Sequence, residues 1–161
     1  TPMQVAALFN TIAAGGVYRS PYVLQATLDE ATGQPVETLS HPRGRRVIPA
    51  QSAALLRAML VQVVQQGTAQ DAAGLSGGAG GKTGTAEEDK SRPNHGLFVG
   101  YAPYDNPEVS MAIRIANGYS SDYACQLSKQ LMTVYFDLDE NGALTDSQTA
   151  LSLETVVGGG D

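Results

Sequence analysis

The chain has 161 residues, a pI of about 4.8 and a formal net charge of −6. Its length suits one domain or part of a larger one, and 42% hydrophobic residues are enough for a core. The acidic balance argues against nucleic-acid binding, no apolar run approaches the ~20 residues that span a bilayer, and the single cysteine, Cys125, excludes an internal disulfide and a multi-cysteine zinc site.

The first residues show the pattern of a helix N-terminus. Thr1 is a good N-cap, Pro2 suits the first helical position, and Gln4 completes a capping box. The pair at 15–16, Gly-Gly, ends this predicted helix. A full-length natural protein rarely begins at a helix cap, so we expect the chain to be an excised fragment.

Residues 17–48 predict short extended pieces. Residues 22–24 and 26–28 are strand-like, and residues 29–33 read as a turn. Residues 41–46 form a basic loop with three arginines. Such a loop could bind an anion, but a solvated loop is the favoured interpretation.

The second predicted helix begins at Pro49 and ends at Gly67. Its apolar residues recur at helical period and predict a buried core face, made of Leu55, Leu56, Met59, Leu60, Val63 and Val64. Residues 97–102 predict a strand, and residues 109–116 alternate as a strand with one buried face. A last helix is expected to start near residues 120–122. The elements together predict a mixed α/β (α+β) fold.

The C-terminal residues 137–161 form an acidic segment with six Asp or Glu residues and no Lys or Arg. Because the remaining residues carry equal numbers of acidic and basic groups, this segment holds the whole net charge. It predicts a solvated, poorly ordered tail, with a docked segment or partner site as the alternative. We therefore expect a folded part over residues 1–136 and a tail over 137–161.

The sharpest local feature is the run from Gly80 to Ala86, which centres on Lys82, Thr83 and Gly84. A phosphate-binding loop, G-x-x-x-x-G-K-S/T, would need glycine where Ser76 stands, and it would need a following helix that the sequence does not predict. The alternative is the Lys-Thr-Gly motif of serine acyltransferases that react with penicillin. Its glycines leave room for a peptide beside the strand, and its hydroxyl and amide groups can bind a carboxylate and an oxyanion.

Four further segments accompany this motif in order: T-P-x-Q-x-A and its glycine end within residues 1–16, V-V-Q-Q-G-T-A at 63–69, H-G-L-F-V-G-Y-A-P at 95–103 and N-P-E at 106–108. Together they resemble the C-terminal part of a penicillin-binding protein transpeptidase domain. Residues 114–121 look most like the monofunctional (class B) members. The resemblance implies part of the transpeptidase/β-lactamase-like fold, in which an antiparallel sheet packs with helices.

The resemblance also implies roles for residues of the motif. Lys82 would tune the electrostatics and proton transfer of the catalytic cleft. Thr83 and Thr85 would bind the terminal carboxylate of a D-Ala-D-Ala stem peptide of peptidoglycan, or that of a β-lactam. The backbone N–H of Thr85 would form half of the oxyanion hole, and Gly84 would keep the strand edge open. The resemblance implies no organic cofactor, and metal ligands at suitable spacing are not evident.

The sequence contains no Ser followed by Lys at the third position and no S-x-N motif. In the family both precede the T-P-x-Q helix, so we expect them upstream and expect this chain to be inert alone. The parent would be a D,D-transpeptidase on the outer face of the bacterial cytoplasmic membrane, tethered by an N-terminal helix. The alternatives are a carboxypeptidase or β-lactamase of the same fold, and a non-catalytic β-lactam sensor or scaffold.

Other chemically capable residues have plainer interpretations. His95 is expected to be a turn residue before a strand rather than a ligand. The acids Glu87, Glu88 and Asp89 are expected to lie in a solvated loop rather than to act as general bases. Cys125 is expected to be a packed small residue rather than a reactive thiol.

The strand over residues 109–116 has a further consequence under the resemblance. In the family this strand pairs with a first strand that the sequence does not contain, so its edge should be unpaired here. An unpaired apolar edge invites another strand to add to it. We therefore expect the chain to dimerise or aggregate through this edge.

Overall fold

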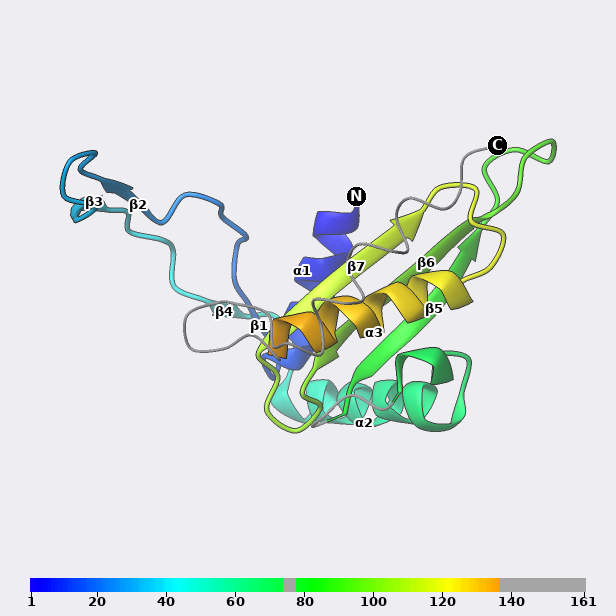
Figure 1. Cartoon of the computed structure of the whole chain (residues 1–161). Coiled ribbons are helices and arrows are strands. Elements are labelled where there is room, and N and C mark those ends of the chain that lie inside the picture. The colour runs from blue at the N-terminus through cyan, green and yellow to red at the C-terminus, as the bar shows by residue number, and fades with distance from the viewer. Residues whose placement is uncertain (74–77, 137–161) are drawn as a thin grey trace.

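The computed structural model describes residues 1–73 and 78–136. A three-stranded antiparallel sheet lies between helices, as Figure 1 shows, and the predicted mixed α/β fold is confirmed. The predicted tail over 137–161 lies outside the described residues. The elements in order are α1 (Pro2–Ala13), β1 (Val17–Tyr18), β2 (Ala26–Leu28), β3 (Pro35–Thr38), β4 (Arg45–Arg46), α2 (Ala50–Gln66), the 3-10 helix η1 (Gln70–Ala72), β5 (Gly80–Ala86), β6 (His95–Ala102), β7 (Val109–Ile115) and α3 (Asp122–Phe136).

The central sheet has the order β5-β6-β7. Its register pairs Thr83 with Phe98 and Phe98 with Ile113, so the side chains of these three residues share one face. Helix α3 covers this face, which we call the α3 face; helix α1 packs against the opposite face, the α1 face. Within the described residues β7 pairs only with β6, so it lies at one edge of this sheet.

The α3 face carries the main hydrophobic core. Phe98 and Ala102 of β6 pack with Ala124, Cys125 and Met132 of α3, and each of these residues is at most 1% exposed. The C-terminal end of α2 adds Val64, which is 2% exposed. These burials remove large apolar side chains from water completely, which contributes about 1.5–3 kcal/mol for each large side chain.

The α1 face has a smaller core that holds the start of β5 and the end of β6. Phe9 and Ala13 of α1 pack with the fully buried Tyr101. The Tyr101 hydroxyl donates to the carbonyl oxygen of Arg57 in α2 at 3.3 Å. The Arg57 guanidinium in turn donates to the carbonyl of Tyr104 at 2.7 Å, so α2 holds the turn between β6 and β7.

The N-terminal cap of α1 forms as the sequence predicts. The amide of Gln4 donates to the Thr1 hydroxyl at 3.4 Å, and the Thr1 ammonium donates to the Gln4 side-chain oxygen at 2.8 Å. After the helix, Gly16 adopts φ +93°, and a Cβ there would collide with the carbonyl of Ile48. Glycine is therefore required where the chain leaves α1.

The segment between α1 and α2 differs in part from the prediction. Residues 22–24 are not a strand; β2 and β3 pair as a hairpin around the turn predicted at 29–33, and this hairpin stands away from the body in Figure 1. Arg45 and Arg46 lie in β4, which pairs with β1, and not in a loop. Arg46 donates to the carbonyl of Gly15 at 2.7 Å, so this arginine fixes the end of α1.

The predicted core stripe of α2 is wrong for its N-terminal half. Leu55 and Met59 are 58% and 54% exposed, whereas Val64 is buried. Periodicity identifies the apolar face of a helix, but burial also needs an element that packs on that face. In residues 1–73 and 78–136 no element buries the N-terminal half of this stripe. No helix in the same ranges is long and apolar enough to cross a membrane.

Candidate functional site

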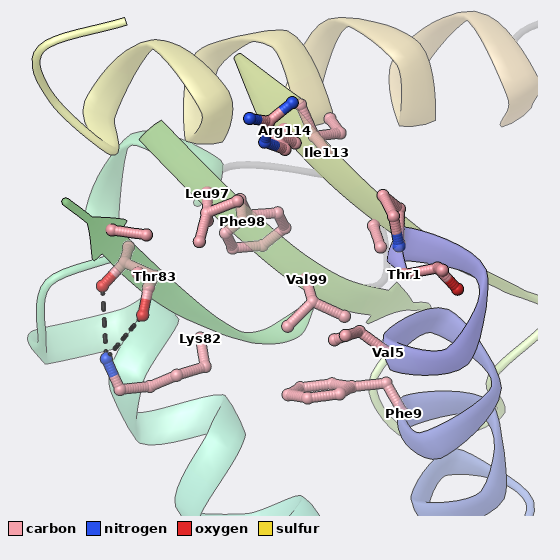
Figure 2. A pocket seen from close by; sticks show the side chains of 14 residues that line it. Thr1, Val5, Phe9, Lys82, Thr83, Leu97, Phe98, Val99, Ile113 and Arg114 are labelled. Atoms are coloured by element: carbon pink, nitrogen blue, oxygen red, sulfur yellow. Dashed lines mark hydrogen bonds between the residues drawn. The ribbon is translucent and has the colours of Figure 1, made fainter. Parts of the chain in front are cut away.

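The predicted motif lies on β5, the edge strand that pairs only with β6 in the described chain. The Lys82 ammonium donates to the carbonyl oxygen of Thr83 at 2.9 Å and to the Thr83 hydroxyl at 3.3 Å, as Figure 2 shows. Lys82 starts on the α1 face and the Thr83 side chain on the α3 face, so these bonds pass around the free edge of β5. The Thr83 carbonyl therefore points away from β6, toward that open edge.

A second threonine joins this arrangement from the loop after α2. The hydroxyls of Thr68 and Thr83 are 2.7 Å apart, which is a short hydrogen bond. Lys82, Thr83 and Thr68 thus form a continuous polar chain beside the strand edge. The sequence placed Lys82 and Thr83 together through the motif, but it did not indicate that Thr68 would join them.

A pocket of about 570 Å³ lies on the α1 face beside this edge. Figure 2 shows Leu97 and Val99 of β6 facing Val5 and Phe9 of α1 across it. The pocket therefore has apolar walls, and its charged side chains are two cations. The lining residues are Thr1, Pro2, Val5, Phe9, Lys82, Thr83, Gly84, Ala86, Leu97, Phe98, Val99, Ala112, Ile113 and Arg114.

The glycines of β5 serve different purposes. A Cβ on Gly80 would lie 2.5 Å from the Tyr101 ring, and one on Gly81 would lie 2.5 Å from the Phe98 ring, so packing requires both to be glycine. A Cβ on Gly84 would meet Leu97 at 3.4 Å, an ordinary contact. Packing therefore does not explain the glycine at 84, which lines the pocket.

His95 is the centre of a polar cluster at the far end of β5 and β6. The backbone N–H of Asn117 donates to its Nδ1 at 3.0 Å, so the ring hydrogen must lie on Nε2. Nε2 therefore donates to the Glu88 carboxylate at 2.6 Å, and the Arg114 guanidinium nitrogen, 2.9 Å from Nε2, cannot donate to that nitrogen as well. The Arg114 guanidinium, 3.7 Å from the same carboxylate, adds an electrostatic attraction. This cluster ties the loop after β5 to β7 and to the turn that follows it.

This cluster corrects two expectations. His95 is the first residue of β6 and is 6% exposed, so it is not a turn residue. Glu88 has an exposed side chain but is paired with His95 rather than simply solvated. The sequence missed the cluster because strand register brings together residues separated by 7 to 22 positions. Asp89 remains in the loop, where Ser91 hydrogen bonds lower the pKa of its carboxyl.

Cys125 is fully buried in the core of the α3 face, which confirms the prediction of a packed residue. Burial raises the pKa of its thiol to about 11, and the negative charges of Asp71 and Asp122 add to this effect. The thiolate is the nucleophilic form of cysteine, so a raised pKa makes this side chain unreactive at neutral pH.

Two other classes of site find no support in the described ranges. Lys82 lies inside a strand, and β5 runs through a loop into β6 without a helix, so the arrangement is not a phosphate-binding loop. Residues 1–73 and 78–136 contain no group of three or more His, Cys, Asp or Glu side chains that could hold a metal ion.

The chain belongs to the penicillin-binding protein transpeptidase family, because the model described as "Penicillin binding protein transpeptidase domain" matches residues 1–133. The resemblance stated from the sequence is thereby confirmed. Stage V sporulation protein D of Bacillus subtilis is 31% identical over 122 residues, which cover 73% of this chain and 19% of that protein. Peptidoglycan D,D-transpeptidase PbpA of Mycolicibacterium smegmatis is 32% identical, over 73% of this chain and 24% of the relative.

Solved structures agree with the fold. The D,D-transpeptidase domain of a peptidoglycan glycosyltransferase from Eggerthella lenta aligns with a TM-score of 0.71 and 31% identity, covering 81% of this chain and 31% of that one. Penicillin-binding protein A from M. tuberculosis, as an imipenem acyl-enzyme complex, aligns with a TM-score of 0.71 and 28% identity, covering 80% and 29%. The chain spans about a fifth to a quarter of the length of these curated relatives.

Proposed function

We propose that this chain is the part of a peptidoglycan D,D-transpeptidase that presents the substrate-binding strand. In the parent, a serine outside this chain attacks the carbonyl of the penultimate D-Ala of a stem peptide. The peptide bond to the terminal D-Ala breaks, that D-Ala leaves with a proton on its amine, and an acyl-serine forms. An amine of a neighbouring stem then takes the acyl group and regenerates the serine.

The observation that carries this proposal is the polar edge of β5. Successive peptide groups of a strand point to opposite sides, so the backbone of Thr85 points the same way as the outward carbonyl of Thr83. An N–H there is free to donate to an oxyanion in the cleft. The Thr83 hydroxyl and the Lys82 ammonium meet at this edge, and Thr85 is an exposed residue two positions further along the same strand. We assign the binding of the terminal carboxylate to these three groups. Gly84 leaves space for the peptide backbone.

The same site supports reaction with β-lactams, which present a strained acyl group and a carboxylate in one small molecule. Penicillin-binding protein A from M. tuberculosis is described as an acyl-enzyme complex with imipenem and with penicillin G. We further propose that the parent is a monofunctional (class B) protein, held by an N-terminal helix at the outer face of the bacterial cytoplasmic membrane.

The test uses the full-length gene product with a D-Ala-D-Ala stem pentapeptide and an amine acceptor. Cross-linked peptide together with released D-Ala is expected, and Thr85→Val should lower the rate about 10- to 100-fold because a hydrogen bond to a charged group is lost. Thr38→Val, on the exposed β3, is the matched control and should change nothing. Release of D-Ala with only hydrolysed tetrapeptide would instead identify a carboxypeptidase. A full-length protein that neither turns over the pentapeptide nor forms an adduct with penicillin would refute the proposal.

The free edge of β7 supports a second, separate proposal about association. Its backbone groups on the side away from β6 have no strand partner in the described chain, so two copies can pair edge to edge. Light scattering of the isolated chain should show a dimer or larger species. A stable monomer with protected β7 amides would contradict this association.

A further inference from the structure

Thr68 is the one hydroxyl of the strand-edge polar chain to which the motif assigns no role. It follows α2 directly, in the run Q-Q-G-T-A, and its side chain is exposed. Its oxygen lies 2.7 Å from the Thr83 oxygen, and Thr83 also receives a hydrogen bond from Lys82 at 3.3 Å. Thr68 therefore contacts a proposed carboxylate-binding group without belonging to the strand.

Hydrogen-bond accounting shows what this contact can do. A threonine hydroxyl has one hydrogen and two acceptor positions, and an ammonium can only donate. Lys82 therefore occupies one acceptor position of Thr83. If Thr68 donates to the other position, both are filled, and the single hydrogen of Thr83 is left to point toward a ligand. A carboxylate is a pure acceptor, so this is the orientation that it requires.

We propose that Thr68 is a positioning residue that turns the Thr83 hydroxyl toward the carboxylate of the stem peptide or β-lactam. This inference rests on the proposed function. Without the Thr68 hydroxyl, one acceptor position of Thr83 is empty and its hydrogen rotates freely. The Thr83 oxygen can then present a lone pair to the carboxylate, which is repulsive.

The loop that carries Thr68 is fixed by bonds that do not involve its hydroxyl. The amides of Gly67 and Ala69 both donate to the carbonyl of Val63 at 3.1 Å, and Ala69 is fully buried. A side chain on Gly67 would also meet the Val63 backbone at 2.8 Å, so the turn packs closely on α2. Removal of the Thr68 hydroxyl is therefore expected to leave the loop in place.

The test measures the second-order rate of acylation of the full-length gene product by benzylpenicillin and by its methyl ester, which lacks the carboxylate charge. Thr68→Val should slow benzylpenicillin about 10-fold and should leave the ester within about 2-fold of wild type, because only the charged acceptor is affected. Thr68→Ser, which keeps the hydroxyl, should restore the rate. The double variant Thr68→Val/Thr83→Val should be no slower than Thr83→Val alone, since both changes remove the same interaction.

The outcomes separate this inference from the proposed function. If wild type reacts with benzylpenicillin but Thr68→Val slows both probes equally, or slows neither, the positioning role is wrong while the proposed function stands. A Thr68→Ser variant as slow as Thr68→Val, or additive losses in the double variant, would also overturn it. If wild type itself does not react, the proposed function fails and the inference fails with it.

Discussion

The two faces of the same three-stranded sheet differ in how far their apolar side chains are buried. On the α3 face, Phe98 and Met132 are at most 1% exposed and form a closed core. On the α1 face, Leu97 and Val99 alternate with Phe98 along the same strand but line an open pocket. The strand contributes apolar residues to both sides, and only the packing of helices distinguishes them.

This difference separates stability from function within one strand pair. On the α3 face Phe98, Cys125 and Met132 are at most 1% exposed, so this face is expected to carry most of the stability. The α1 face leaves Lys82 and Gly84 accessible beside an apolar pocket, so it can bind a ligand. Substitutions on the two faces should therefore affect different measurements.

The largest contrast is expected within α3. Met132 is fully buried and its neighbour Leu131 is 48% exposed. Met132→Ala should lower the free energy of unfolding by about 2–5 kcal/mol because it opens a cavity in the closed core. Leu131→Ala should lower it by less than about 1 kcal/mol. Urea denaturation of both variants measures the difference, and equal losses would show that the α3 face is not the stable one.

The titration of Cys125 tests the closure of the same core. Burial raises the pKa of its thiol from 9.0 to about 11, so the folded chain holds this proton more tightly than the unfolded chain. The stabilisation is complete below pH 9 and is lost as pH rises to 11, by about 2–3 kcal/mol. Cys125→Ala should remove this loss between pH 9 and 11. An unchanged pH profile in that variant would mean that the thiol is not buried.

The smallest expected effect on stability comes from substitutions along β5, where the α1 face changes from a packed core to a pocket. Gly80 and Gly84 lie on that face, but only Gly80 contacts the buried Tyr101. Gly80→Ala should destabilise the chain by about 1–3 kcal/mol through overpacking. Gly84→Ala should leave the melting temperature nearly unchanged and slow penicillin acylation of the full-length protein. If both variants unfold alike, the face is closed along its whole length.

Local and motif-based features could be predicted from the sequence. The α1 cap depends on Thr1 and Gln4, three positions apart, and the Lys-Thr-Gly strand depends on a contiguous motif. Both involve residues whose interaction is set by short chain separation or by a family pattern. The family itself followed from five ordered segments because their order and spacing are specific when combined.

Features that depend on tertiary neighbours could not be predicted. Periodicity predicts that the apolar stripe of α2 is core, yet Met59 is exposed, because periodicity does not reveal which element covers a face. The pairing of His95 with Glu88 and the contact of Thr68 with Thr83 arise from strand register and loop packing. In neither pair does the separation along the sequence indicate that the two residues are in contact.

The assignment of the β5 edge as a penicillin-binding site is tested most directly by the intact mass of two proteins after incubation with excess benzylpenicillin: this 161-residue chain and the full-length gene product. An adduct is expected on the full-length protein only, because the proposed function assigns substrate binding to β5 and the reactive serine to a part of the protein outside this chain. An adduct on the 161-residue chain would show that one of its own residues is acylated. A full-length protein without an adduct would contradict the assignment of the β5 edge as a penicillin-binding site.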